Sequence, residues 1–505
     1  MTKKKHIAKE KRSKFWLFNR FGMLHRSPHL VIPILLVNFL ISLYFLNQQN
    51  IVTFDGTYYI RYFNGDYPWM GPFPFGYPLI ISFFKLFISD EVIAARLVTA
   101  LLGSALLYPL SQVFMRLFSE KIGLLLLFAA ALNPVVIRYS TLTLSDLPYL
   151  FFLMFSLWMF LEKRLLPAVM LASVSYLIRP EGLIFAAAYT VIFFIRERKW
   201  RETIYASSII LFIILVFAVE NHSRKGRWTI SAKASNFQLW DINDWRKNEE
   251  WKSAKNEPTK IEIAKHVFEQ YPIRLLALLN YIKTSSTLPI AIIGLIGLIR
   301  RPNLFWIFFV QLLLTPLYGL NLSLRYGLPY FYPLLVGCGF FLNSFNKRVD
   351  LKLITAFAAV VGVVFLFNLK YLRQPELTTP DNNFFELKEV GLHLRGKIPK
   401  DAVIMDRKPY FAFYSNGGKY VSIPPASINE VIKTSLSNNV DYLVLSERIV
   451  KIFRPKLIPL LNIKKKNFGP YLTTFYDDTK QRKGYGVRIY KINKHKKPQN
   501  SASKR

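Results

Sequence analysis

The chain has 505 residues, of which 52% are hydrophobic and 16% aromatic, and its formal net charge is +36. Many apolar runs approach the ~20 residues that a helix needs to cross ~30 Å of hydrocarbon. This pattern is typical of a multi-pass membrane protein and argues against a soluble protein. The positive charge fits cytoplasmic loops and contact with anionic membrane lipid, so we expect no nucleic-acid partner. Because Cys338 is the only cysteine, no intrachain disulfide can form.

The N-terminal region combines a basic tail with an apolar run. Residues 1–27 are rich in Lys and Arg and are predicted to form a cytoplasmic tail. The run at about 29–46 is long enough to span a bilayer. No convincing small-residue cleavage pattern accompanies it, so we predict that it is retained as the first membrane span.

The stretch at 51–89, within a predicted outer loop at 49–90, is too polar to continue that span. Asp55 lies near its start, and prolines alternate with glycines and aromatic residues further on. Two apolar pieces, at about 58–63 and 78–88, are too short to cross a membrane. They are predicted to lie on its surface as amphipathic helices. We interpret this loop as the floor of an active site at the outer face of a membrane.

Further apolar runs bring the predicted count to about eleven membrane helices, within a transmembrane domain at 28–371. A second polar outer loop is predicted at about 220–271, after the seventh span. The predicted spans after the first lie at about 92–118, 122–137, 147–161, 165–178, 183–195, 203–219, within 273–299, and at about 304–320, 326–342 and 351–369.

The charges between these runs predict the orientation of the chain. With the N-terminus in the cytoplasm, the inner turns contain the basic clusters at 196–201, 300–301 and 347–348. The short outer turns contain only single basic residues. This distribution follows the positive-inside rule for a protein of the cell membrane. An odd number of spans then places both long loops and the C-terminal region outside.

The C-terminal region at about 378–493 lacks long apolar runs and is predicted to be a small soluble α/β domain. Helical spacing is found at 383–395 and 427–437, and short apolar strands are predicted at 402–405 and 442–445. Helices that alternate with strands favour this fold class. The last stretch, 494–505, is basic and polar and is predicted to be disordered.

The polar residues that hydrocarbon would penalise fall at one level in this topology, the outer membrane face. Ionisable residues near the membrane core are costly and therefore mark candidate functional sites. Carboxylates beside several cations suit the deprotonation of a nucleophile and the binding of a phosphate. The candidate carboxylates and cations are Asp55, Asp146, Lys85, Arg96, Arg179 and Arg325.

Each candidate also has a purely structural interpretation. Asp55 is placed to cap a helix that begins near Tyr58, and Asp146 precedes Leu147 and Pro148 at the start of a predicted helix. The long side chain of Lys85 can reach the interface from a surface helix. Two of the arginines have a possible local partner, Arg96 in Glu91 and Arg179 in Glu181. The carboxylates that could take the place of Asp55 are Asp66, Asp90 and Glu91.

Several short motifs in this order resemble the GT-C glycosyltransferases of the protein O-mannosyltransferase and aminoarabinose-transferase type. In that family the first outer loop begins with an acidic residue and a following Tyr, and continues into a Gly/Pro-rich stretch that ends in Pro-Leu. The resemblance covers nearly the whole chain. The residues that carry it lie at 55–59, 71–79, 94–103, 177–182, 325–329, 414–418 and 440–445.

The resemblance implies an integral membrane enzyme that takes a sugar from a polyprenyl-phosphate donor and passes it to a glycan, lipid or protein acceptor. It implies an inverting displacement in which a carboxylate, Asp55 with Asp146 as the second candidate, accepts the proton. Lys85, Arg96, Arg179 and Arg325 are then the expected partners of the lipid phosphate, without a metal or cofactor. Many members have an Asp-Glu pair in the first loop, whereas Gly56 follows Asp55 here.

Two other classes of function compete with the transferase. A multi-pass transporter or flippase for a lipid-linked or anionic substrate often shows internal repeats and broken helices. We find no convincing repeat between the two halves of this sequence. A membrane scaffold that only presents the C-terminal domain would not require carboxylates and cations gathered at one depth.

Overall fold

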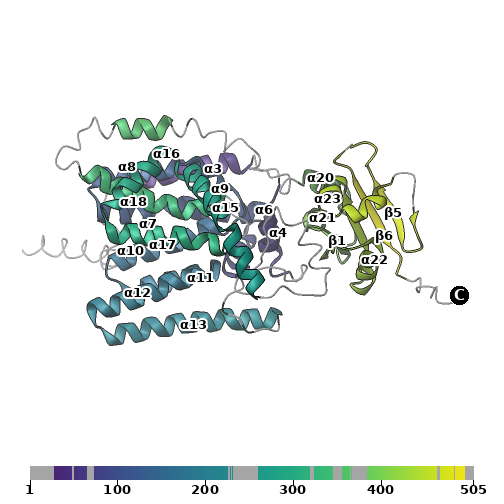
Figure 1. Ribbon diagram of the computed structural model, residues 1–505, viewed down its shortest axis with the longest axis horizontal. Helices are drawn as coiled ribbons and strands as arrows, with labels where there is room; N and C mark the ends of the chain where they lie inside the picture. Colours follow the sequence, from purple (N-terminus) through teal and green to yellow (C-terminus); the bar gives the residue numbers. More distant parts are fainter. Residues whose placement is uncertain are drawn as a thin grey trace, which may run out of the picture.

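The computed structural model of the chain consists of a large helical part, followed by a smaller part built on a sheet (Figure 1). The described residues are 28–47, 51–64, 73–225, 260–318, 324–344, 355–363, 384–462, 467–482 and 484–494, with the single positions 228, 230 and 366. The predicted tails at 1–27 and 495–505 and most of the polar loop at 220–271 lie outside these residues.

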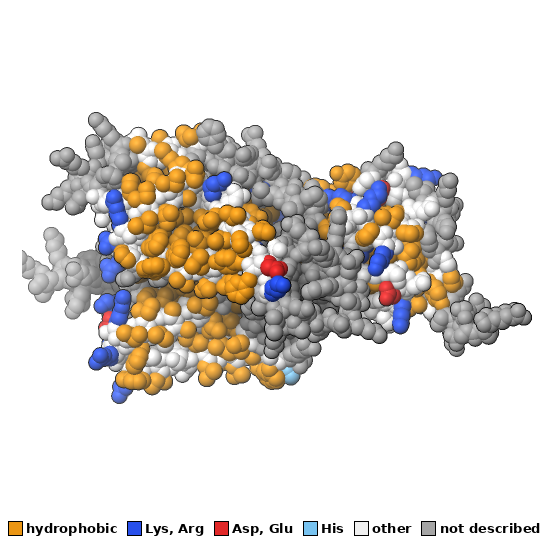
Figure 2. Space-filling view, in the orientation of Figure 1, with side chains coloured by type: hydrophobic (Ala, Val, Ile, Leu, Met, Phe, Trp, Pro, Cys, Tyr) orange, Lys and Arg blue, Asp and Glu red, His pale blue; other side chains and the backbone are white. Residues whose placement is uncertain are grey.

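Apolar helices make up the first part. Its elements are α3 (Pro28–Leu46), α4 (Phe54–Arg61), α5 (Gly76–Lys85), α6 (Glu91–Ala105), α7 (Leu107–Leu117), α8 (Glu120–Ala131), α9 (Pro134–Thr141), α10 (Asp146–Leu161), α11 (Leu165–Ile178), α12 (Gly182–Glu197), α13 (Trp200–Lys225), α15 (Lys260–Ser286), α16 (Leu288–Ile299), α17 (Pro302–Tyr318), η2 (Leu324–Gly327) and α18 (Leu328–Ser344). Figure 2 shows hydrophobic side chains over most of the visible face of this part, with Lys and Arg gathered at the end away from the sheet.

Three helices among the described residues are long and apolar enough to cross a membrane, at His29–Leu46, Glu91–Leu117 and Trp200–Arg224. The number rises to five if each of two bent helix pairs is counted as one span. The helices α10 and α11 are apolar but shorter. The chain therefore has the apolar helices of a multi-pass membrane protein, while the count of about eleven spans stays a prediction.

Two of the predicted spans are broken helices. The span at 122–137 consists of α8 and α9, which meet at 54°, and the region 273–299 contains the 104° bend between α15 and α16. At the first break Asn133 adopts an extended conformation before Pro134, and its side chain caps α9. At the second break Thr287 has a φ of 65°. The Asn133 Nδ2 donates to the Ser285 carbonyl at 2.7 Å, so the two breaks are joined.

The C-terminal part contains a six-stranded mixed sheet in the order β2-β1-β3-β6-β5-β4. The first three strands are parallel and the others antiparallel. Helices cover both of its faces, with α20 and α21 on one and α22 and η4 on the other. Its elements are α20 (Phe385–His393), β1 (Val403–Asp406), α21 (Tyr410–Ser415), β2 (Lys419–Ser422), α22 (Ile428–Ser437), β3 (Tyr442–Ser446), α23 (Glu447–Phe453), η4 (Pro455–Leu461), β4 (Asn467–Phe468), β5 (Leu472–Asp477) and β6 (Val487–Ile492).

The short helix α4 lies where the two parts meet. Ile51 and Tyr58 are buried in the same apolar cluster as Phe384, Tyr410 and Phe411 of the C-terminal part. In Figure 1 the label of α4 lies at the edge of the helical part that faces α20 and α21. The packing therefore fixes α4 against both parts of the molecule.

Candidate active site

The start of α4 determines where Asp55 points. Thr53 is the N-cap of this helix, and its Oγ1 accepts a hydrogen bond from the Gly56 amide at 3.0 Å. The same hydroxyl donates to the Thr143 carbonyl at 2.8 Å, which fastens the cap to the segment before α10. The interpretation of Asp55 as a cap is therefore wrong. Asp55 lies in the first helical turn, where backbone N–H groups favour a negative charge.

Gly56 occupies a position that accepts no side chain without movement of its neighbours. A Cβ atom there would lie 2.7 Å from Thr53 Oγ1 and 2.8 Å from both Thr143 Cβ and a methyl group of Val52. Such distances are below van der Waals contact, so a larger residue would push α4 away from residue 143. This packing explains in physical terms why Gly56, and not a Glu, follows Asp55.

Asp55 forms an ion pair with Arg325 from a distant part of the chain. The Arg325 Nη1 donates to the Asp55 Oδ2 at 2.6 Å, and both side chains are partly exposed. Arg325 lies on the short 3-10 helix η2, which packs against α15 so closely that Gly327 faces the Tyr281 carbonyl. The charge of Asp55 is thus held by a cation without being sealed from solvent.

A second carboxylate, Asp146, forms an ion pair with Arg179. The distance between Arg179 Nη1 and Asp146 Oδ1 is 2.5 Å, and Arg179 Nη2 also lies 3.4 Å from Glu181 Oε1. The local Arg179–Glu181 pair inferred from the sequence therefore exists alongside a longer-range pair. Asp146 does not cap α10, because the N-cap is Ser145, whose side chain makes no capping bond.

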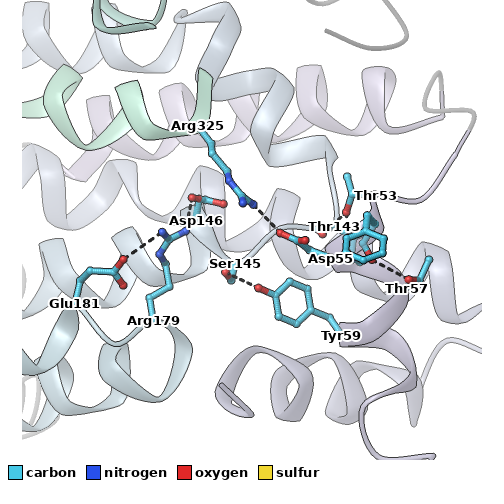
Figure 3. Close-up of polar contacts among 12 residues, drawn as sticks. Thr53, Asp55, Thr57, Tyr59, Thr143, Ser145, Asp146, Arg179, Glu181 and Arg325 are labelled. Carbon is cyan, nitrogen blue, oxygen red and sulfur yellow. Dashed lines mark hydrogen bonds and ion pairs between the residues drawn. The ribbon is translucent and has the colours of Figure 1, made fainter. Parts of the chain in front are cut away.

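The two ion pairs lie side by side. Figure 3 shows the Arg325 guanidinium beside the Asp146 carboxylate while it contacts Asp55. The Asp146 Oδ2 is buried and has no hydrogen-bond partner among the described residues. The Tyr59 hydroxyl lies 3.0 Å from the Ser145 hydroxyl and closes the cluster on the side of α4. Burial raises the pKa of Tyr59, and the charge of Asp55 raises it further, so this phenol stays protonated.

The structure holds Lys85 and Arg96 through contacts other than these two ion pairs. Lys85 Nζ lies 3.0 Å from Glu91 Oε2, and Arg61 is 3.7 Å from the other oxygen of Glu91. Arg96 is 8% exposed, and its Nη2 donates to the Ile51 carbonyl at 3.0 Å. Asp90, one of the alternatives to Asp55, caps α6 through the amides at 92 and 93.

An apolar cleft of about 400 Å³ opens between the start of α5 and the C-terminal half of α13. Four of its lining residues are apolar, and Glu220 and Ser223 lie at its polar end. The helix α11, whose C-cap is Arg179, borders the same region through the tilted ring contact between Tyr176 and Phe217. The residues that line the cleft are Phe75, Leu215, Val216, Val219, Glu220 and Ser223.

Sequence reasoning missed the polar residues that complete the cluster. Thr53, Thr143 and Ser145 contribute hydroxyl and carbonyl groups next to the ion pairs. The run of Ser and Thr residues at 140–145, directly before an apolar helix, is the feature that could have revealed them. Within the described residues, no three or more His, Cys, Asp or Glu side chains are grouped as a metal site would require.

No family model and no curated protein matches the chain by sequence, whereas solved structures match it over most of its length. The oligosaccharyltransferase of Archaeoglobus fulgidus, in a complex with Zn and sulfate, has a TM-score of 0.54 and 13% identity, over 92% of this chain and 74% of that protein. ArnT from Cupriavidus metallidurans, bound to undecaprenyl phosphate, has a TM-score of 0.56 and 12% identity, over 94% of this chain and 100% of that protein. The chain shares the fold of these two GT-C glycosyltransferases.

The GT-C fold agrees with the resemblance read from the motifs at 55–59 and 325–329. A further match is the Archaeoglobus enzyme tethered to an acceptor peptide that contains the NVT sequon, with a TM-score of 0.52, 13% identity and 94% of this chain covered. At these identities the likeness concerns the fold, and the chemistry has to be argued from the residues of this chain.

Proposed function

We propose that this GT-C chain transfers a sugar from a polyprenyl-phosphate donor to an acceptor hydroxyl or amine at the outer face of the membrane. The observation that carries the proposal is the pair of adjacent ion pairs, Asp55–Arg325 and Asp146–Arg179, drawn from four separate elements. Support comes from the solved structures with the same fold, one of which binds undecaprenyl phosphate and another an acceptor peptide.

In the proposed reaction Asp55 is the general base. It accepts the proton from the acceptor while the acceptor atom forms a bond to the anomeric carbon. The bond between that carbon and the phosphate oxygen breaks, and its electron pair leaves with the polyprenyl phosphate. Attack opposite the leaving group inverts the anomeric configuration. Asp55 is suited to this step because its side chain is 19% exposed and therefore accessible.

Arg325 and Arg179 are the proposed partners of the departing phosphate. Both guanidinium groups already face carboxylates, so a phosphate that arrives beside them would share N–H donors that are already positioned. Donors placed before the reaction stabilise the charge that develops on the leaving oxygen. Asp146 then holds Arg179 in place, and Lys85 and Arg96 remain candidates for the edge of the phosphate site.

The apolar cleft beside α13 is the proposed path of the isoprenoid chain. Its walls are apolar, and Phe75 packs against the same Tyr176–Phe217 cluster as Leu177, which precedes the turn that carries Arg179. A lipid phosphate at that turn would direct its hydrocarbon along Phe75 and Leu215 and away from water. In this arrangement the N-terminus lies in the cytoplasm, and the sheet of the C-terminal part lies outside with the active site.

The proposal is tested by an Asp55→Asn variant, reconstituted with polyprenyl-phosphate sugars and assayed for donor consumption. Loss of a general base is expected to lower turnover by about 10²- to 10⁴-fold. The matched control is Asp90→Asn, because Asn also caps helices well and the residue lies in the same loop. Equal turnover in parent and Asp55→Asn protein would refute the role of Asp55. Native mass spectrometry of the parent with the same lipid panel identifies the donor.

A transporter or flippase is the second candidate, and one observation favours it. Broken helices joined by polar groups, such as α8–α9 and α15–α16 bridged by Asn133, are common where transporters bind substrate. The two candidates differ in their products. Transport in proteoliposomes leaves the lipid-linked sugar intact, whereas the transferase converts it to polyprenyl phosphate. Movement of intact donor without any released polyprenyl phosphate would favour transport.

A further inference from the structure

The helix that carries Asp55 is held at both ends by a single turn of the C-terminal part. At its start the Val52 amide donates to the Tyr414 hydroxyl at 2.8 Å, 362 residues away in sequence. At its end the Arg61 Nη2 donates to the Asn416 Oδ1 at 3.1 Å. Tyr414 belongs to α21 and Asn416 is the C-cap of that helix, so the two contacts come from positions only two residues apart.

The geometry of α21 makes these contacts specific. Asn416 has a φ of 61°, a left-handed conformation that Gly and Asn adopt most readily. This cap turns the Asn416 side chain toward Arg61, while the Arg61 guanidinium also lies 5.5 Å from the Phe413 ring centre. Phe413, Tyr414 and Asn416 therefore hold α4 through one rigid turn.

The helical part restrains the same helix through contacts of its own. Arg96 donates a hydrogen bond to the Ile51 carbonyl. The amide of the next residue, Val52, is the one that donates to the Tyr414 hydroxyl. Glu91 lies 3.7 Å from Arg61, which contacts Asn416 as well. The backbone at 51–52 and the side chain of Arg61 thus connect α6 with α21, and Asp55 lies between these two attachment points.

We infer that Tyr414 and Asn416 are positioning residues, through which the C-terminal part sets the placement of Asp55 in the active site. This inference rests on the proposed transferase function. Their hydrogen bonds are to Val52 and Arg61, so their effect reaches the carboxylate through the two ends of an eight-residue helix. Because catalytic groups must lie within a fraction of an ångström of the productive geometry, loosening either end is expected to lower the rate of the chemical step.

The test compares variants that remove one contact each without disturbing the fold. Tyr414→Phe removes the hydroxyl, and Asn416→Gly removes the acceptor but accepts the left-handed backbone. Each is expected to lower kcat by about tenfold. The donor KM and the thermal midpoint should stay close to those of the parent, since the ion pairs and the core are retained. Asn416→Asp restores an acceptor for Arg61 and should recover most of the lost kcat.

The matched control is Tyr490→Phe, which removes a buried phenol that donates to the Leu460 carbonyl within the same part of the molecule. It should leave kcat unchanged, because no contact to α4 is involved. The inference is overturned if Tyr414→Phe and Asn416→Gly retain parental kcat. It is also overturned if their decrease in kcat equals that of Tyr490→Phe and is proportional to a decrease in the thermal midpoint. Asp55→Asn, assayed in parallel, separates the hypotheses: if it is also fully active, the proposed base is wrong as well.

Discussion

Carboxylates in the membrane part and in the C-terminal part lie in opposite electrostatic surroundings. Asp55 and Asp146 each lie within 2.6 Å of an arginine nitrogen, and their side chains keep some exposure. Asp406, at the end of β1, is 1% exposed, and its Oδ2 has no hydrogen-bond partner among the described residues. The first two are paired with cations, whereas burial favours the neutral form of the third.

Physical surroundings explain the difference. Burial raises the pKa of Asp406 to about 8, the charge of Glu386 adds to this, and the amides of Arg407 and Lys408 oppose it. A carboxyl group that is neutral near pH 7 can be buried at low cost, but it is a poor partner for a cationic site. The comparison indicates that carboxylates are paired with cations where we place chemistry, whereas burial favours a neutral group where only packing is needed.

The largest expected effect comes from breaking the buried ion pair in the membrane part. Arg179→Met leaves Asp146 without its partner in a site where both side chains are largely buried. Removal of one partner of a buried pair typically destabilises a protein by about 3 to 5 kcal/mol. We therefore expect a lower thermal midpoint in detergent, together with loss of donor consumption.

The control for Arg179→Met is Arg116→Met, which breaks an exposed ion pair with Glu162 in the helical part. Exposed pairs contribute about 0 to 1 kcal/mol, so this variant should behave like the parent. Equal thermal midpoints for the two variants would contradict the distinction between a buried functional pair and a surface pair.

A smaller effect is expected from the pH dependence of the C-terminal part. Asp406 binds a proton up to about pH 8 when folded, whereas the unfolded chain releases it near its ordinary value of 3.8. The folded state thus binds more protons between these values, and stability falls as the pH rises through this window. Between about pH 6 and pH 8 the loss from this residue is about 2 kcal/mol.

Asp406→Asn removes this titration while keeping the shape of the neutral carboxyl. The variant should therefore show a flatter dependence of the thermal midpoint on pH, with the gain over the parent greatest at the alkaline end. Asp401→Asn, at an exposed position before β1, is the control and should follow the parental curve. A parallel decline in Asp406→Asn and parent would mean that other groups cause the pH dependence.

The same contrast explains what the sequence could and could not predict. The strands at 402–405 and 442–445 and the helix at 427–437 were predicted close to β1, β3 and α22, because their patterns are local. Pro134 is also a residue that can end a helix, yet the apolar run around it was predicted as one span. Hydrophobicity indicates burial in lipid. It does not reveal a bend whose free backbone N–H and C=O groups are satisfied by polar caps.

The candidate site was predicted as a set of residues but not as a set of contacts. Asp55, Asp146, Arg179 and Arg325 were selected because charge at membrane depth is costly. Nothing local to Asp55 indicates that its partner lies 270 residues away on η2. Lys85 and Arg96 satisfied the same criterion, although the structure attaches them to Glu91 and the backbone at Ile51. Tertiary packing alone distinguishes these cases.

The smallest expected effect is that of a chelator on donor consumption. A divalent cation between Asp55 and Asp146 would have to displace Arg325 and Arg179, which already neutralise both carboxylates at hydrogen-bond distance. EDTA should therefore leave turnover within about twofold of the untreated protein, because each carboxylate keeps its organic cation. If chelation abolished turnover and one divalent ion restored it, the arginines would be partners of a metal-bound site, and the contrast with Asp406 would have to be restated in terms of that ion.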